Sequence, residues 1–162
     1  MKACYPGTFD PITNGHLDII ERSARVFDEV DVLIMTNPRK INIFSEAERK
    51  EMIEKSLAPL SGCKNVHVRI GEGLTVDFAR KIGASAIVRG IRAVSDYEYE
   101  LQQATANQML DDTIETLFFI ARPVYSFLSS SVVREIAANG GSIESMVPSA
   151  ICQMVKRKLE KR

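Results

Sequence analysis

The sequence predicts a doubly wound, Rossmann-like α/β domain with a five-stranded parallel sheet and helices on both faces. Short runs rich in β-branched residues alternate along the chain with segments of helical periodicity. The 162 residues suffice for one continuous core, so we expect a single domain over residues 1–162. No internal repeat, low-complexity tract or interdomain linker interrupts this order.

Five segments have the composition of strands. They are KACY at 2–5, VDVLIMT at 30–36, VHVRI at 66–70, ASAIVRG at 84–90 and TLFFIA at 116–121. Because the segments between them are long enough for helices, each connection is expected to be a right-handed crossover between parallel strands.

The intervening segments have helical patterns. Leu17, Ile20, Ala24 and Phe27 follow helical spacing, and SEAE at 45–48 is a capping box that opens the next helix. Further helices are predicted at 75–82, 96–110, 130–139 and 148–159. The helix at 130–139 is expected to stop at the glycine pair 140–141.

Composition excludes several classes of protein. Twenty-one Lys and Arg balance twenty-one Asp and Glu, and 45% of residues are hydrophobic, so nothing in the bulk charge demands nucleic acid or a membrane. The three cysteines lack ligand spacing, which argues against a disulfide framework or a zinc site. Without a signal-peptide core or a long apolar run, a cytoplasmic location is expected.

Polar residues follow every predicted strand, at the sheet edge where ligands of such folds bind. Along the chain these residues are Thr8 and His16, then Lys40, then Thr75, then Arg89 and Arg92, and finally Ser129 to Ser131. Cations, hydroxyls and helix N-terminal amides together stabilise anionic oxygens. The residues themselves therefore predict a nucleotide or phosphate site.

The loop YPGTFDPITNGH at 5–16 is the most distinctive part of this edge. We expect Pro6 and Gly7 to turn the chain sharply off the first strand. His16 is expected at the start of a helix, where the positive end of the macrodipole favours a neutral imidazole. Neither GxxxxGK[ST] nor a complete GxGxxG occurs, so a P-loop kinase and a standard dinucleotide enzyme are disfavoured.

With these residues in place, the chain resembles the bacterial phosphopantetheine adenylyltransferase family of the nucleotidyltransferase superfamily. The blocks are YPGTFDPITNGH at 5–16, VRGIRAVSDYEYE at 88–100 and SFLSSSVVRE at 126–135, with NPRK and LTVDFA between them. The HxGH-like signature of the superfamily is present as TNGH. The resemblance runs essentially end to end.

This resemblance implies an activity and its partners. The family transfers the adenylyl group of ATP to 4′-phosphopantetheine, giving dephospho-coenzyme A and pyrophosphate. It implies Mg²⁺ that arrives with ATP rather than on a protein metal site, a homohexamer, and inhibition by coenzyme A. No nucleic acid or membrane partner is implied.

The resemblance also assigns roles to residues. ATP contacts are implied for Thr8, Phe9, His16, Gly90, Ile91, Arg92, Glu100, Tyr125, Ser126, Phe127, Leu128, Ser129, Ser130 and Ser131. Contacts with phosphopantetheine are implied for Thr8, Lys40, Thr75 and Arg89. His16, Lys40 and Arg92 are the expected catalytic residues, with His16 donating to the transition state of a direct in-line attack.

Two other functions stay open at this level. A sister nucleotidyltransferase would use nicotinamide mononucleotide or glycerol phosphate as the acceptor, and the block at 88–100 disfavours both. A non-catalytic sensor of adenine nucleotides or coenzyme A would not require His16, Lys40, Arg89 and Arg92 together. Each residue alone has a structural explanation, and His67 is interpreted as a strand residue without a ligand role.

Overall fold

The computed structural model describes residues 1–36 and 41–160. Its five strands form one parallel sheet in the order β3-β2-β1-β4-β5. The bounds are β1 Lys2–Gly7, β2 Glu29–Met35, β3 Val66–Gly71, β4 Ala86–Ile91 and β5 Glu115–Ile120. The strand order reverses between β1 and β4, which places a topological switch point at the centre of the sheet.

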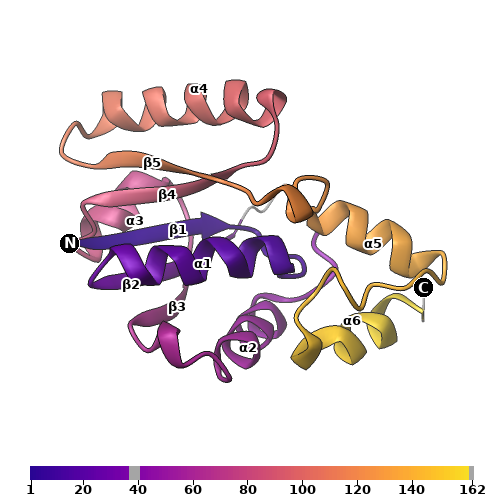
Figure 1. The fold of residues 1–162 in the computed structure, drawn as a ribbon. Coiled ribbons are helices and arrows are strands. Elements are labelled where there is room, and N and C mark those ends of the chain that lie inside the picture. The colour runs from indigo at the N-terminus through magenta and orange to yellow at the C-terminus, as the bar shows by residue number, and fades with distance from the viewer. Residues whose placement is uncertain (37–40, 161–162) are drawn as a thin grey trace.

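Helices cover both faces of the sheet. The helices are α1 Asn14–Val26, α2 Glu46–Leu57, α3 Thr75–Lys81, α4 Val94–Leu110, α5 Ser130–Ala138 and α6 Cys152–Leu159. Helices α1 and α2 pack on one face, and α3 and α4 pack on the other. Figure 1 shows α5 and α6 beyond the arrowhead of β1, at the carboxyl end of the sheet.

The predicted fold class is confirmed, and so are all five strands and all six helices to within a few residues. The capping box at Ser45 is present, with Ser45 and Glu48 each satisfying the other's backbone amide. Gly140 takes a left-handed φ of 75° just after α5, as its predicted stop requires.

Some boundaries differ from the predictions for local reasons. Pro6 and Gly7 do not turn the chain off β1, because they pair in register with Leu33 and Ile34 and thus belong to the strand. The last helix opens with the 3₁₀ turn η3 Ser149–Ile151 before α6 begins. Two further 3₁₀ turns, η1 Ser61–Cys63 and η2 Pro123–Tyr125, were not predicted.

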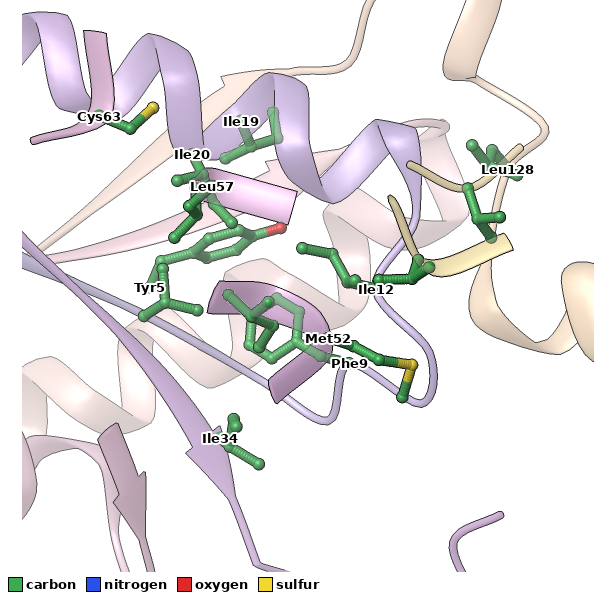
Figure 2. Packing of buried hydrophobic residues seen from close by; sticks show 14 of the residues in the cluster. Tyr5, Phe9, Ile12, Ile19, Ile20, Ile34, Met52, Leu57, Cys63 and Leu128 are labelled. Carbon is green, nitrogen blue, oxygen red and sulfur yellow. The ribbon is translucent and has the colours of Figure 1, made fainter. Parts of the chain in front are cut away.

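The larger core lies between the sheet and helices α1 and α2, and it continues under the loop that follows β1. Figure 2 shows Tyr5, Phe9, Ile12, Met52 and Leu128 in this cluster. Burial of such side chains contributes about 1.5–3 kcal/mol each. The loop is therefore anchored to the core on its inner side.

No helix within the described ranges combines the length and apolarity needed to cross a membrane. All three cysteines are buried free thiols.

Candidate active site

The chain turns at Phe9, in the loop between β1 and α1. Phe9 has a φ of 51°, a left-handed conformation that non-glycine residues seldom adopt. Its ring is buried and meets the rings of Tyr5 and His16 edge to face, at centroid distances of 5.4 and 5.1 Å. A Cβ atom at Gly7 would lie 2.8 Å from this ring. Gly7 is thus needed for space, and the turn itself comes two residues later than predicted.

Three arginines from three different elements donate to backbone carbonyls at the end of β1 and in this loop. Arg89 of β4 donates to the Pro6 carbonyl at 2.7 Å, and Arg49 of α2 donates to the Thr8 carbonyl at 2.8 Å. Arg134 of α5 donates to the carbonyl of Asp10. Alternate carbonyls from the end of β1 into the loop are therefore each fixed by a cation.

The side chain of Asp10 ties the loop to the segment that precedes α2. Its carboxylate is buried and accepts hydrogen bonds from the backbone amides of Ile43 and Phe44, both at 2.9 Å. On the other side, the Ser130 hydroxyl donates to the carbonyl of Pro11 at 2.7 Å. The loop is consequently held between α2 and α5.

A cavity of about 260 Å³ opens beside this loop, at the switch point between β1 and β4. Eleven of the residues predicted for the site line it: Thr8, Phe9, His16, Arg89, Gly90, Arg92, Glu100, Tyr125, Leu128, Ser129 and Ser130. Because these residues come from the loop after β1, from α1, β4, α4 and η2 and from the start of α5, the tertiary fold brings together segments that are far apart in the sequence.

A second cavity of about 420 Å³ adjoins the first and shares Thr8 and Ser130 with it. It is also lined by Asp10, Ile41, Asn42, Ser131 and Arg134. The N-terminus of α5 contributes to both linings, through Ser129 and Ser130 to the first and through Ser130 and Ser131 to the second.

His16 is the third residue of α1 and forms a capping box with Thr13. The backbone N–H of Thr13 donates to Nδ1 at 3.1 Å, so the neutral ring carries its proton on Nε2. Burial, followed by the charges of Arg92 and Arg89, lowers the pKa of His16 to about 4. The lowered pKa agrees with the expected neutral imidazole, and its causes are burial and the two arginines.

The two arginines of the first cavity are held by carboxylates of α4. Arg89 forms a two-pronged ion pair with buried Glu100, at 2.6 Å from both its Nε and its Nη2. Arg92 pairs with Asp96 at 2.9 Å and donates to the Leu128 carbonyl at 2.8 Å. Glu100 and Asp96 thereby fix the direction of both guanidinium groups.

The start of α5 has the features of an anion site. Ser129 is the N-cap and accepts from the Val132 amide at 3.2 Å. Amides at the N-terminus of a helix donate to anions, and the dipole favours negative charge there. The chemistry suited to this edge is stabilisation of phosphate oxygens.

Several residues that were predicted for the site line neither cavity. Ile91 ends β4 and is buried, and Ser126 donates to the carbonyl of Pro123. Phe127 is 59% exposed and lines neither cavity. Thr75 is the first residue of α3 and also lines neither one. Lys40 lies outside the described residues.

Sequence reasoning missed Asp10, Arg49 and Arg134. Asp10 and Arg134 lie inside the sequence blocks that carry the resemblance, but no role was assigned to either residue. Arg49 carries no sequence signal, because it lies within a helix that also contains Lys50, Glu51 and Glu54. Arg49 differs from these charged neighbours because its side chain is buried, and burial becomes visible only in the packed structure.

Among residues 1–36 and 41–160, no group of three or more His, Cys, Asp or Glu side chains is arranged to hold a metal ion. The carboxylates nearest the cavities are engaged with arginines or backbone amides. Mg²⁺ prefers carboxylate and phosphate oxygens in octahedral geometry.

Comparison with known proteins places this geometry in context. Residues 4–136 match the model of the cytidylyltransferase-like family. A phosphopantetheine adenylyltransferase of Finegoldia magna is 54% identical over 97% of this chain and 95% of its own. The protein of the same name from Dictyoglomus thermophilum is 48% identical, over 98% and 94%. A Plasmodium falciparum nicotinic acid mononucleotide adenylyltransferase complexed with NaAD has the same fold, with a TM-score of 0.71 at 16% identity and coverage of 99% and 97%.

Proposed function

The chain belongs to the cytidylyltransferase-like family and, within it, to the phosphopantetheine adenylyltransferases, and from this premise we propose that it transfers the adenylyl group of ATP to 4′-phosphopantetheine. The products are dephospho-coenzyme A and pyrophosphate. The observation that carries the proposal is the cavity at the switch point, where His16, Arg89, Arg92 and the N-terminus of α5 converge.

The reaction is a direct in-line attack without a covalent intermediate. The nucleophile is an ionised phosphate of phosphopantetheine, so no side chain has to remove a proton from it. It attacks the α-phosphorus of ATP, a P–O bond forms there, and the bond to the departing pyrophosphate breaks. The protein has to align two polyanions and offset their repulsion.

His16 is proposed to stabilise the transition state. Its Nδ1 is occupied by the Thr13 amide, and the neutral ring therefore presents Nε2–H as a donor. A lowered pKa keeps the ring in this form at neutral pH, so the tautomer is set before substrate binds. Phe9 packs edge to face on the ring and limits its rotation.

The remaining polar groups are proposed to bind the two substrates. Arg92 and the segment Tyr125–Ser131 with the amides of α5 are assigned to ATP, together with Thr8, Phe9, Gly90, Ile91 and Glu100. Arg89, Thr8, Thr75 and Lys40 are assigned to phosphopantetheine. Mg²⁺ is proposed to enter with the phosphates of ATP and to supply positive charge at the departing oxygens.

Assembly into a homohexamer and inhibition by coenzyme A belong to the same proposal. Support for an oligomer comes from α4 and β5, whose outer surfaces expose large apolar side chains. These are Val94, Tyr97, Tyr99, Leu101, Met109, Leu110, Leu117 and Ile120. Exposed apolar side chains gathered on two neighbouring elements support a protein–protein contact there. A cytoplasmic location is also part of the proposal.

The test is an assay of pyrophosphate release with ATP, Mg²⁺ and 4′-phosphopantetheine. Rapid release that depends on phosphopantetheine is expected. Reactions with CTP, and with nicotinamide mononucleotide as the acceptor, serve as controls. Turnover only with a control acceptor would assign the chain to a sister activity, and no turnover with any acceptor would favour a sensor.

A further inference from the structure

The most unusual charge in the molecule is Arg49, in the first turn of α2. Its side chain is 1% exposed and is among the largest that are fully buried. It takes part in none of the ion pairs formed within the part of the chain that the structure describes. The Nε atom has no hydrogen-bond partner there either.

A buried cation without a carboxylate is costly, because desolvation is not offset by an opposite charge. The other arginines of the site are balanced: Arg89 by Glu100, Arg92 by Asp96 and, more loosely, Arg134 by Asp10 at 3.7 Å. A neutral donor would satisfy a carbonyl at lower cost. The charge of Arg49 therefore calls for an explanation other than packing.

The one contact that Arg49 makes through Nη1 connects it to both cavities. It donates to the Thr8 carbonyl at 2.8 Å, and Thr8 lines the first and the second cavity. The guanidinium is thus hydrogen-bonded to the backbone of a residue that lines both cavities. Thr8 also directly precedes the left-handed residue Phe9, whose ring contacts His16.

We propose that Arg49 is a positioning residue for adenylyl transfer, which fixes the Thr8–Phe9 turn beneath the reacting phosphates and whose buried charge is balanced by the bound polyanion. This inference rests on the proposed function. The turn sets both the Thr8 hydroxyl and the contact of Phe9 with His16. A displaced turn would misalign the reactants, and a misplacement of about 1 Å can lower a rate by about 10²-fold.

The buried charge of Arg49 should also determine how strongly a bound polyanion stabilises the fold. In the free protein it has no counter-ion among the described residues, whereas phosphate oxygens above Thr8 would provide one. Ligands that bind only the folded state raise its melting temperature. A polyanion should therefore stabilise the natural protein more than a variant in which the buried charge is removed.

The experiment compares the natural protein with Arg49→Met, Arg49→Lys and the control Arg69→Met. Arg69 pairs with buried Asp31 on the opposite face of the sheet, so its loss destabilises the fold away from the site. Steady-state kinetics with ATP, Mg²⁺ and phosphopantetheine give kcat and KM. Melting by circular dichroism with and without magnesium pyrophosphate gives the ligand-induced shift in Tm.

Arg49→Met is expected to lower kcat about 10²-fold with less than a threefold change in the KM for ATP, and to reduce the Tm shift caused by pyrophosphate by at least half. Arg49→Lys should recover about tenfold in kcat over Arg49→Met and stay about tenfold below the natural protein, because lysine keeps the charge but not the planar guanidinium. Arg69→Met should keep kcat and the pyrophosphate shift within twofold of the natural protein despite a lower Tm.

Natural kcat and an unaltered pyrophosphate shift in Arg49→Met would overturn the inference, as would a loss of kcat in Arg69→Met equal to that in Arg49→Met. If Arg49→Met does not fold, Arg49→Lys decides, since a kcat equal to that of the natural protein would overturn the positioning role. If the natural protein does not turn over phosphopantetheine, the proposed function fails, and the pyrophosphate shifts still test Arg49.

Discussion

At the scale of single residues, the structure explains how His16 can act as a donor at neutral pH. Its Nδ1 is used by the Thr13 amide, and its pKa lies at about 4 because of burial and two nearby arginines. The histidine is thereby kept neutral, with one defined tautomer. Its identity was visible in the TNGH motif, but the source of its neutrality was not.

Substitution of His16 by alanine is expected to lower kcat by about 10²–10³-fold, the usual cost of one preorganised donor. ATP affinity should change little, because the interaction strengthens in the transition state. Steady-state kinetics together with calorimetric titration of ATP would measure both. His67→Ala is the control and should leave both quantities unchanged; equal losses of rate and affinity in His16→Ala would contradict the role.

The lowered pKa of His16 predicts how stability depends on pH. The unfolded chain has the ordinary value of about 6.5, so unfolding takes up a proton between pH 6.5 and 4. The free energy of unfolding attributable to His16 should therefore fall as the pH is lowered through this window, by a total on the order of 3 kcal/mol.

Urea unfolding of the free protein across this pH range would measure the effect. His16→Asn, which retains an acceptor for the Thr13 amide, is the reference. The natural protein should lose more stability on acidification than this variant does. Parallel pH profiles for the two proteins would show that the pKa of His16 is not lowered.

At the scale of elements, the helix α5 joins the site to the rest of the fold. Its N-cap Ser129 lines the first cavity, and Ser130 is bonded to the loop after β1. The serines were predicted from the sequence as a cap beside phosphates. Their bond to a loop 119 residues earlier was not, because it depends on long-range packing.

Loss of the α5 cap in Ser129→Ala should destabilise the protein by about 1 kcal/mol and raise the KM for ATP severalfold. The control is Ser56→Ala, which removes a buried hydroxyl bonded to the Met52 carbonyl at 2.7 Å in α2. Chemical denaturation and steady-state kinetics would compare them. A similar rise in KM in both variants would mean that the effect comes from general destabilisation.

At the scale of the whole molecule, the apolar surface of α4 and β5 predicts self-association. The charged substitution Leu101→Glu on α4 should lower the mass of the assembly in light scattering, because an interface does not tolerate an unpaired carboxylate. Val26→Glu, at an exposed apolar position on α1, is the control and should leave the mass unchanged. An unaltered mass in Leu101→Glu would place the interface elsewhere.

The sequence by itself determined the fold class, the order of strands and helices along the chain, and most residues of the first cavity. These follow from local periodicity, from cap and turn residues, and from blocks long enough to specify a family. His16, Arg89, Arg92 and the serines at 129–130 were found in this way because each lies in such a block.

Only the tertiary structure decided the left-handed turn at Phe9, the pairing of Arg89 with Glu100, and the burial of Arg49. The physical reason is that these features depend on contacts between distant segments. Asp10 reaches amides 33 and 34 residues away, and Arg49 reaches a carbonyl 41 residues away. Residue type does not encode such distances, and burial of a charge becomes apparent only when the elements have packed.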